Sequence, residues 1–166
     1  MNAKEFVKLA RQSIPNLPDA NTLALLNDES FRAEVCDEIN KSVSASDREL
    51  SRHILKLDTA SHQGDWGMSD DMRLSAFLLF KIANVEDSLL IWQAKESNFD
   101  TFCGLDIQLT VGAGIDETIT YLKSLSDESA LAAATYIEEC RNAGDFKNLD
   151  KYAEEWDKYF GNQRAG

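Results

Sequence analysis

The residues best suited to chemistry gather in the middle of the chain. Two histidines, His53 and His62, are followed by three acids, Asp65, Asp70 and Asp71. Imidazole and carboxylate groups bind divalent metals and transfer protons, so this segment could serve a small metal-dependent or hydrolytic enzyme. His53, His62, Asp65 and Asp70 are the candidate metal ligands. Their spacing matches no His-Glu-x-x-His pair and no calcium-binding loop, so we expect no metal ion and no other cofactor.

Two further patterns look chemical at first sight. Gly112-Ala113-Gly114 is reminiscent of a phosphate-binding loop, but no strand precedes it and the acids Asp116 and Glu117 follow it. A helix that stops and another that starts explain all of these residues, so we favour that interpretation over a phosphate-binding loop. A nucleophile at Cys103 would need a histidine from elsewhere in the chain, and no Gly-x-Ser-x-Gly motif occurs. The motifs therefore favour a protein that is not an enzyme.

The cysteines point to a reducing environment. Cys36, Cys103 and Cys140 are odd in number and far apart, and no Cys-x-x-Cys pair is present. We therefore expect buried, inert thiols. The N-terminus lacks an apolar signal core, and no run approaches the roughly 18 apolar residues that span a bilayer. These observations predict a cytoplasmic protein.

The charge is strongly acidic and unevenly distributed. The formal net charge is −12, of which −2 falls in residues 1–60 and −10 in residues 61–166. Nucleic acids and anionic membranes attract basic proteins, so neither is expected as a partner. A basic protein is the partner that this charge favours.

One tryptophan stands outside the apolar stripes that predict a core. Trp66 lies in a polar segment, where it could anchor a partner or fold back over the helices. The residues that we predict to bind a partner are Trp66, Asp70, Asp71, Asp100 and Asp106. Asp100 has a competing interpretation, because it precedes a helix and could cap it.

Hydrophobic spacing predicts helices along the whole chain. Apolar residues recur at helical intervals around 3–14, 19–26, 29–39 and 47–57. Both prolines, Pro15 and Pro18, lie near the N-terminus, so later helices can run without interruption. Residues 61–71 break the periodicity and are expected to form a loop.

A recurrence at thirty residues organises the second half. Ala113-Gly114-Ile115-Asp116-Glu117-Thr118 repeats the pattern of Ala83-Asn84-Val85-Glu86-Asp87-Ser88, with a weaker copy from Ala143. Asn84, Gly114 and Gly144 are residue types that tolerate the left-handed backbone at a helix end. Each unit is thus predicted to be a helix, a tight turn and a second helix. Residues 105–111 alternate like a strand, but their place in the repeat favours a helix.

Two-helix units of this length resemble short HEAT-like repeats, an α-solenoid architecture, over residues 69–160. The resemblance implies an all-α fold of stacked antiparallel helix pairs with about ten helices, and no site residues. We expect a single domain over 1–166, with N-terminal helices in 1–60, the loop in 61–71 and the repeats in 72–160.

The function expected from these features is a non-enzymatic protein-interaction module with an acidic surface. An immunity-like, antitoxin-like or adaptor role toward a basic protein would suit it. The alternative is a small metal-dependent or hydrolytic enzyme using the segment that contains His53, His62, Asp65, Asp70 and Asp71. A scaffold or oligomerisation subunit is a third possibility, and the oligomeric state is not predicted.

Overall fold

The computed structural model describes residues 1–64 and 66–163, and the regular structure within these ranges is entirely helical. This confirms the all-α class and the expected number of helices. The described ranges contain α1 (Ala3–Gln12), α2 (Ala20–Leu23), α3 (Glu29–Asn40), α4 (Arg48–His62), α5 (Asp70–Ile82), α6 (Ser88–Lys95), α7 (Phe99–Gly104), α8 (Ile115–Ser124), α9 (Glu128–Ala143) and α10 (Leu149–Gln163). Four 3₁₀ helices join them: η1 (Ala24–Asn27), η2 (Ala45–Asp47), η3 (Val85–Asp87) and η4 (Ile107–Val111).

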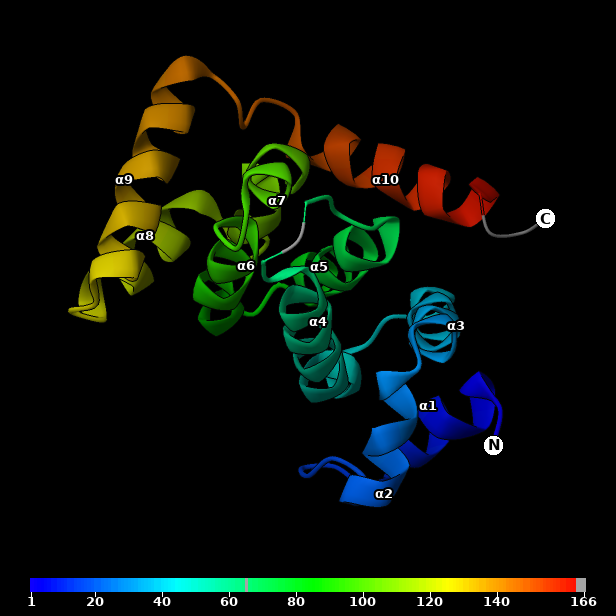
Figure 1. Ribbon diagram of the computed structural model, residues 1–166. Coiled ribbons are helices and arrows are strands. Elements are labelled where there is room, and N and C mark those ends of the chain that lie inside the picture. The colour runs from blue at the N-terminus through cyan, green and yellow to red at the C-terminus, as the bar shows by residue number, and fades with distance from the viewer. Residues whose placement is uncertain (65, 164–166) are drawn as a thin grey trace.

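The elements follow one another across the molecule until the last helix reverses the direction (Figure 1). The helices α1–α3 lie at one end, α4–α7 in the middle, and α8 and α9 at the other end. From there α10 runs back toward α3. Locally, the helices begin where the sequence supplies a cap: Asp28 accepts from the amide of Phe31 at 2.8 Å, and Asp127 from that of Ala130 at 2.8 Å.

Two hydrophobic cores hold the chain together. The larger one unites α1, α3, α4 and α5 and includes Phe6, Ile39, Ile54 and Phe77. The smaller one is formed mainly by α8 and α9. Both cores receive residues from α6 and η4, which therefore connect them.

This double contact explains the strand-like alternation of residues 105–111. A 3₁₀ helix has three residues per turn, so residues two apart point in different directions. Leu109 packs in the larger core, whereas Ile107 and Val111 pack in the smaller one. The predicted helix is confirmed, but it is a 3₁₀ helix that begins at Ile107 and ends at Val111.

The boundary between the two halves is shorter than predicted. The helix α4 continues through His62 and α5 begins at Asp70, so the connection covers 63–69 rather than 61–71. Ser69 begins α5 as its cap, because its hydroxyl accepts from the amide of Met72 at 3.1 Å. Residues 61–62 of the predicted loop therefore belong to α4, and residues 70–71 belong to α5.

The turns of the thirty-residue recurrence differ in their backbone. Gly144 ends α9 in the left-handed conformation with φ of 89°, as predicted, whereas Gly114 precedes α8 with φ of 114° and ψ of 148°, outside that conformation. In the first copy, however, the left-handed residue is Ala83, with φ of 59°, and the prediction for Asn84 is wrong. Asn84 is extended and caps η3 by accepting from the amide of Glu86. The similar sequences therefore stop their helices at different positions.

The helix α10 packs on α5, two units earlier in the chain. Phe160 lies 5.7 Å from Phe77 between ring centroids, and the Arg73 guanidinium lies 5.1 Å from the centroid of Trp156. A solenoid unit contacts its neighbours only, so α10 departs from the arrangement that the HEAT-like resemblance implies.

Candidate functional site

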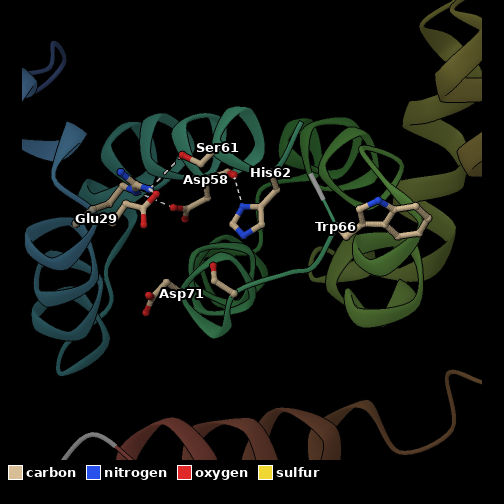
Figure 2. A pocket seen from close by; sticks show the side chains of 8 residues that line it. Glu29, Asp58, Ser61, His62, Trp66 and Asp71 are labelled. Carbon is tan, nitrogen blue, oxygen red and sulfur yellow. Dashed lines mark hydrogen bonds and ion pairs between the residues drawn. The ribbon is translucent and has the colours of Figure 1, made fainter. Parts of the chain in front are cut away.

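A cavity of about 300 Å³ opens between α3, α4, α5 and the 63–69 connection (Figure 2). We call it the α4 pocket. Its lining combines carboxylates, hydroxyls, an imidazole and an indole, namely Glu29, Arg32, Asp58, Ser61, His62, Trp66, Ser69 and Asp71. Of the eight residues that we predicted to bind a partner or a metal, three line this pocket: His62, Trp66 and Asp71.

A buried ion pair forms the floor of the pocket. Arg32 of α3 is 5 % exposed, and its Nε donates to Asp58 Oδ1 at 2.6 Å. A second nitrogen of Arg32 donates to the carbonyl of Leu26 at 2.7 Å, and Ser75 donates to the other oxygen of Asp58 at 2.9 Å. The pair is therefore hydrogen-bonded on both sides, as buried charges must be to offset their loss of hydration.

Burial raises the pKa of Asp58, and the neighbouring charge of Asp71 adds to this effect. The hydrogen bond and charge of Arg32, together with the hydroxyl of Ser75, oppose it. Asp58 and Asp71 both line the α4 pocket, and their like charges repel each other. A cation in the α4 pocket would relieve that repulsion.

His62 has one defined tautomer when it is neutral. Its Nδ1 lies 2.7 Å from the carbonyl oxygen of Asp58. A carbonyl oxygen can only accept, so Nδ1 carries the proton and Nε2 is left as an acceptor. Figure 2 shows the imidazole extending from α4 beside Asp58, on the side of the pocket toward Trp66. The ring therefore adds an acceptor to the pocket.

The charged groups around the cavity leave it acidic. Glu29, Asp58 and Asp71 are carboxylates, and Arg32 is the single cation in the lining. With His62 neutral, the lining carries a formal charge of −2. The side chain of Glu29 is 77 % exposed, and its closest approach to Arg32 is 4.0 Å. The guanidinium of Arg32 donates to Asp58 and to the carbonyl of Leu26. Glu29 and Asp71 add negative charge to the opening.

Trp66 stands at the rim of the pocket and is 88 % exposed. Its connection is fastened to the start of α7: the Asn98 side chain donates to the carbonyl of His62 at 3.1 Å, and the amide of Gly67 donates to the carboxylate of Asp100. In Figure 2 the indole points away from His62 and Asp58. The alternative in which Trp66 folds back over the helices is therefore wrong, because hydrogen bonds hold its backbone while the indole lies in solvent.

Two aromatic residues of α7, Phe99 and Phe102, are also exposed. They are 71 % and 36 % exposed. Phe99 lies between Asn98 and Asp100, the two residues that fasten the 63–69 connection. The ring of Phe102 packs against those of Trp92 and Tyr136, so we keep the name aromatic rim for the two most exposed rings, Trp66 and Phe99.

The predicted metal ligands do not converge. His53 and His62 are nine residues apart on α4, which is two and a half turns, so they lie on opposite faces. Asp70 is paired with Arg73 at 2.6 Å, and Asp65 lies outside the described residues. Among the residues that are described, no three histidine, cysteine or acidic side chains are placed to hold a metal ion.

Three of the predicted partner-binding acids make contacts within the chain. Asp100 accepts from Gly67, Asp106 accepts from the Tyr152 hydroxyl at 3.0 Å, and Asp70 accepts from the Tyr159 hydroxyl at 2.7 Å. The last two bonds attach α10 to the rest of the molecule. Asp100 and Asp106 are consequently better explained as structural acceptors than as contacts to a partner.

The prediction of buried thiols is wrong at one position. Cys36 and Cys140 are buried, whereas Cys103 is exposed. Cys103 follows Phe102 on α7, whose opposite face packs inward through Thr101. Neither His53 nor His62 belongs to α7, and nothing in the described hydrogen bonds joins either histidine to Cys103.

Sequence reasoning did not single out Glu29 and Arg32. Arg32 had a detectable signal, because it occupies the apolar stripe that Val35, Cys36 and Ile39 continue toward the core. Asp58 likewise follows Leu50 and Ile54 at intervals of four residues. A charged residue at a core position is expected to have a buried partner, but the spacing does not say which one.

The sequence matches no protein-family model, and no curated protein and no solved structure is significantly similar to it. Across the described part of the chain, no helix combines the length and the apolar character that crossing a bilayer requires.

Proposed function

We propose that this protein is a non-enzymatic protein-interaction module that binds a basic protein partner through its acidic surface. The observation that carries the proposal is Trp66, which is 88 % exposed on a fastened connection beside the acidic α4 pocket. Large aromatic side chains are enriched among the residues that contribute most to protein interfaces. A fixed backbone also lowers the entropy that binding must overcome.

The charge distribution supports a basic partner. Residues 61–166 carry a net charge of −10, and the lining of the α4 pocket is negative. Such a surface accelerates encounters with basic proteins and repels nucleic acids and anionic membranes. An immunity-like, antitoxin-like or adaptor role would use these properties, with inhibition or recruitment of the basic protein as the outcome.

Affinity capture tests this function. The immobilised protein is exposed to a cell extract at about 50 mM and about 500 mM salt, beside a Trp66→Ala variant as the matched bait. We expect a basic protein that binds at low salt, weakens at high salt and is lost from the variant. Recovery of no basic protein at low salt, or only of salt-insensitive ones, would overturn the proposal. A molecular mass in solution above one chain that Trp66→Ala abolishes would instead identify self-association.

A further inference from the structure

We propose that two copies of this chain exchange their last helix, so that α10 of each copy packs on α5 of the other. The inference goes beyond the proposed function, because it uses neither Trp66 nor any other residue that lines the α4 pocket. The surface under α10 is thereby assigned one occupant, the α10 of a second copy. Exchange of an identical element is a low-cost route to a dimer, because the single chain already makes every contact that the dimer needs.

One face of α10 is aromatic and packs on the larger core. Its rings recur at intervals of four, three and one residues, which places them on one side of the helix: Tyr152, Trp156, Tyr159 and Phe160. Phe160 is 2 % exposed, and the other three are partly buried against the core. The helix therefore rests on the surface of the larger core, from which it can separate as a unit.

Polar contacts fix the position of α10 on α5. The Tyr159 hydroxyl donates to Asp70 at 2.7 Å, and Lys81 Nζ lies 2.6 Å from Asp157 Oδ1. The partners are 89 and 76 positions apart in the sequence. Contacts over such separations do not depend on a direct link between the two elements, so the α10 of a second copy can form them with the same geometry.

The connection between α9 and α10 supplies the hinge. Phe146 is buried in the smaller core and holds the chain at that point. Two residues later, Asn148 is exposed and has φ of 62°, a left-handed conformation that asparagine tolerates better than most residues. The chain turns back within this connection, because α10 then runs toward α3 (Figure 1). An extended Asn148 would relieve the strain and direct α10 away from its own α5, and strain in a short hinge favours exchange.

Two variants of the hinge test the proposal in the full chain. Asn148→Val introduces a β-branched side chain that disfavours the left-handed conformation, whereas Asn148→Gly adopts it freely. Analytical ultracentrifugation at chain concentrations from about 10 μM to about 1 mM measures the dimer. Relative to the parent chain, we expect the dissociation constant of the dimer to fall at least about tenfold in Asn148→Val and to rise about threefold in Asn148→Gly.

A turn elsewhere in the chain provides the matched control. Ser126, between α8 and α9, is also exposed and has φ of 51°. Ser126→Val creates the same kind of strain at a turn that does not lead into α10. It should lower the thermal midpoint but change the dissociation constant of the dimer less than about twofold.

A mixture of two charge variants identifies the contact that is exchanged. Lys81→Glu places two acids opposite each other within one chain, and Asp157→Lys places two cations there. Exchange between the variants gives an opposite pair at both contacts between α5 and α10. The two are mixed, one of them labelled with ¹⁵N, until native mass spectrometry shows a constant distribution. We expect heterodimers at least about fivefold above the statistical proportion.

A second mixture controls for charge alone. Lys151 and Glu155 form an ion pair at 3.6 Å, and both lie on α10. Their charges move together when the helix is exchanged, so Lys151→Glu and Glu155→Lys should form heterodimers in the statistical proportion.

Several results would overturn the exchange of α10. One is the absence of a dimer in Asn148→Val at about 1 mM, and another is an equal gain in Ser126→Val. A dimer in which the Lys81→Glu and Asp157→Lys chains mix statistically would have a different interface. So would a dimer that Trp66→Ala abolishes. None of these results affects the proposed function, which is tested by capture of a basic protein.

Discussion

The two ends of α4 carry similar charged residues and use them differently. At its N-terminal end, Arg48 donates to the buried carboxylate of Asp87 at 3.0 Å, and Arg52 contacts the same carboxylate. At its C-terminal end, Asp58 accepts from Arg32 and, with His62, lines the α4 pocket. One end is a closed ionic contact between helices, and the other is the edge of a cavity.

The balance of charge explains the difference. Two arginines share the buried Asp87, and Glu86 takes a further bond from Arg48 at 2.9 Å, so the donors and acceptors there satisfy one another. The lining of the α4 pocket contains three carboxylates, Asp58 among them, and a single arginine. A helix with charges at both ends can therefore form a packed ionic contact at one end and border a cavity at the other, depending on what the neighbouring helices contribute.

The largest effect is expected from Arg32→Met. The change leaves Asp58, which is 1 % exposed, without its cation, so the free energy of unfolding should fall by about 3–5 kcal/mol in urea denaturation. Arg32→Met combined with Asp58→Leu is the control, and it should recover most of the loss because no buried charge remains. A double variant as unstable as the single one would show that the ion pair is needed for more than mutual neutralisation.

A smaller loss is expected from Asp87→Asn, about 1–3 kcal/mol by the same measurement. The side chains of Arg48 and Arg52 are 21 % and 24 % exposed, so they can turn to Glu86, Glu49 and water. Glu86→Gln, at a side chain that is 59 % exposed, is the matched control and should cost under about 0.5 kcal/mol. The comparison between the two ends fails if Asp87→Asn destabilises more than Arg32→Met.

The middle of α4 should give a weak pH dependence. Burial lowers the pKa of His53, and Lys56 adds to this effect. The unfolded chain therefore takes up the proton at a higher pH than the folded chain, so His53 lowers stability as the pH falls below about 6.5. We expect His53→Gln to reduce the difference in thermal midpoint between pH 8 and pH 5. An unchanged difference would place the cause in other groups.

The smallest effect on stability is expected from Trp66→Ala, within about 0.5 kcal/mol of the parent protein, because the indole is 88 % exposed. Trp92→Ala is the contrasting variant. Trp92 is 3 % exposed in the smaller core, so its loss should cost about 3–5 kcal/mol. A large loss for Trp66→Ala would mean that the aromatic rim supports the fold and would remove its role in binding.

Part of the geometry of the site follows from the sequence alone. The nine-residue interval between His53 and His62 already places the two histidines on opposite faces of any helix that contains both. Arg32 and Asp58 lie on apolar stripes, which likewise indicates that both charged side chains are buried. Their pairing could not be predicted, because it depends on how α3 and α4 cross, and residues 26 positions apart show no local pattern.

The sequence by itself determined the helices and where most of them begin. Caps such as Asp28 and Asp127 act on amides three residues away, and apolar periodicity is also local. Tertiary structure decided where residues 107–111 pack, since Leu109 joins the larger core while Ile107 and Val111 join the smaller one. It also decided the role of Gly112, where a Cβ would collide with the carbonyl of Phe80. Such requirements arise from surfaces that meet only after the chain has folded, so no short stretch of sequence contains them.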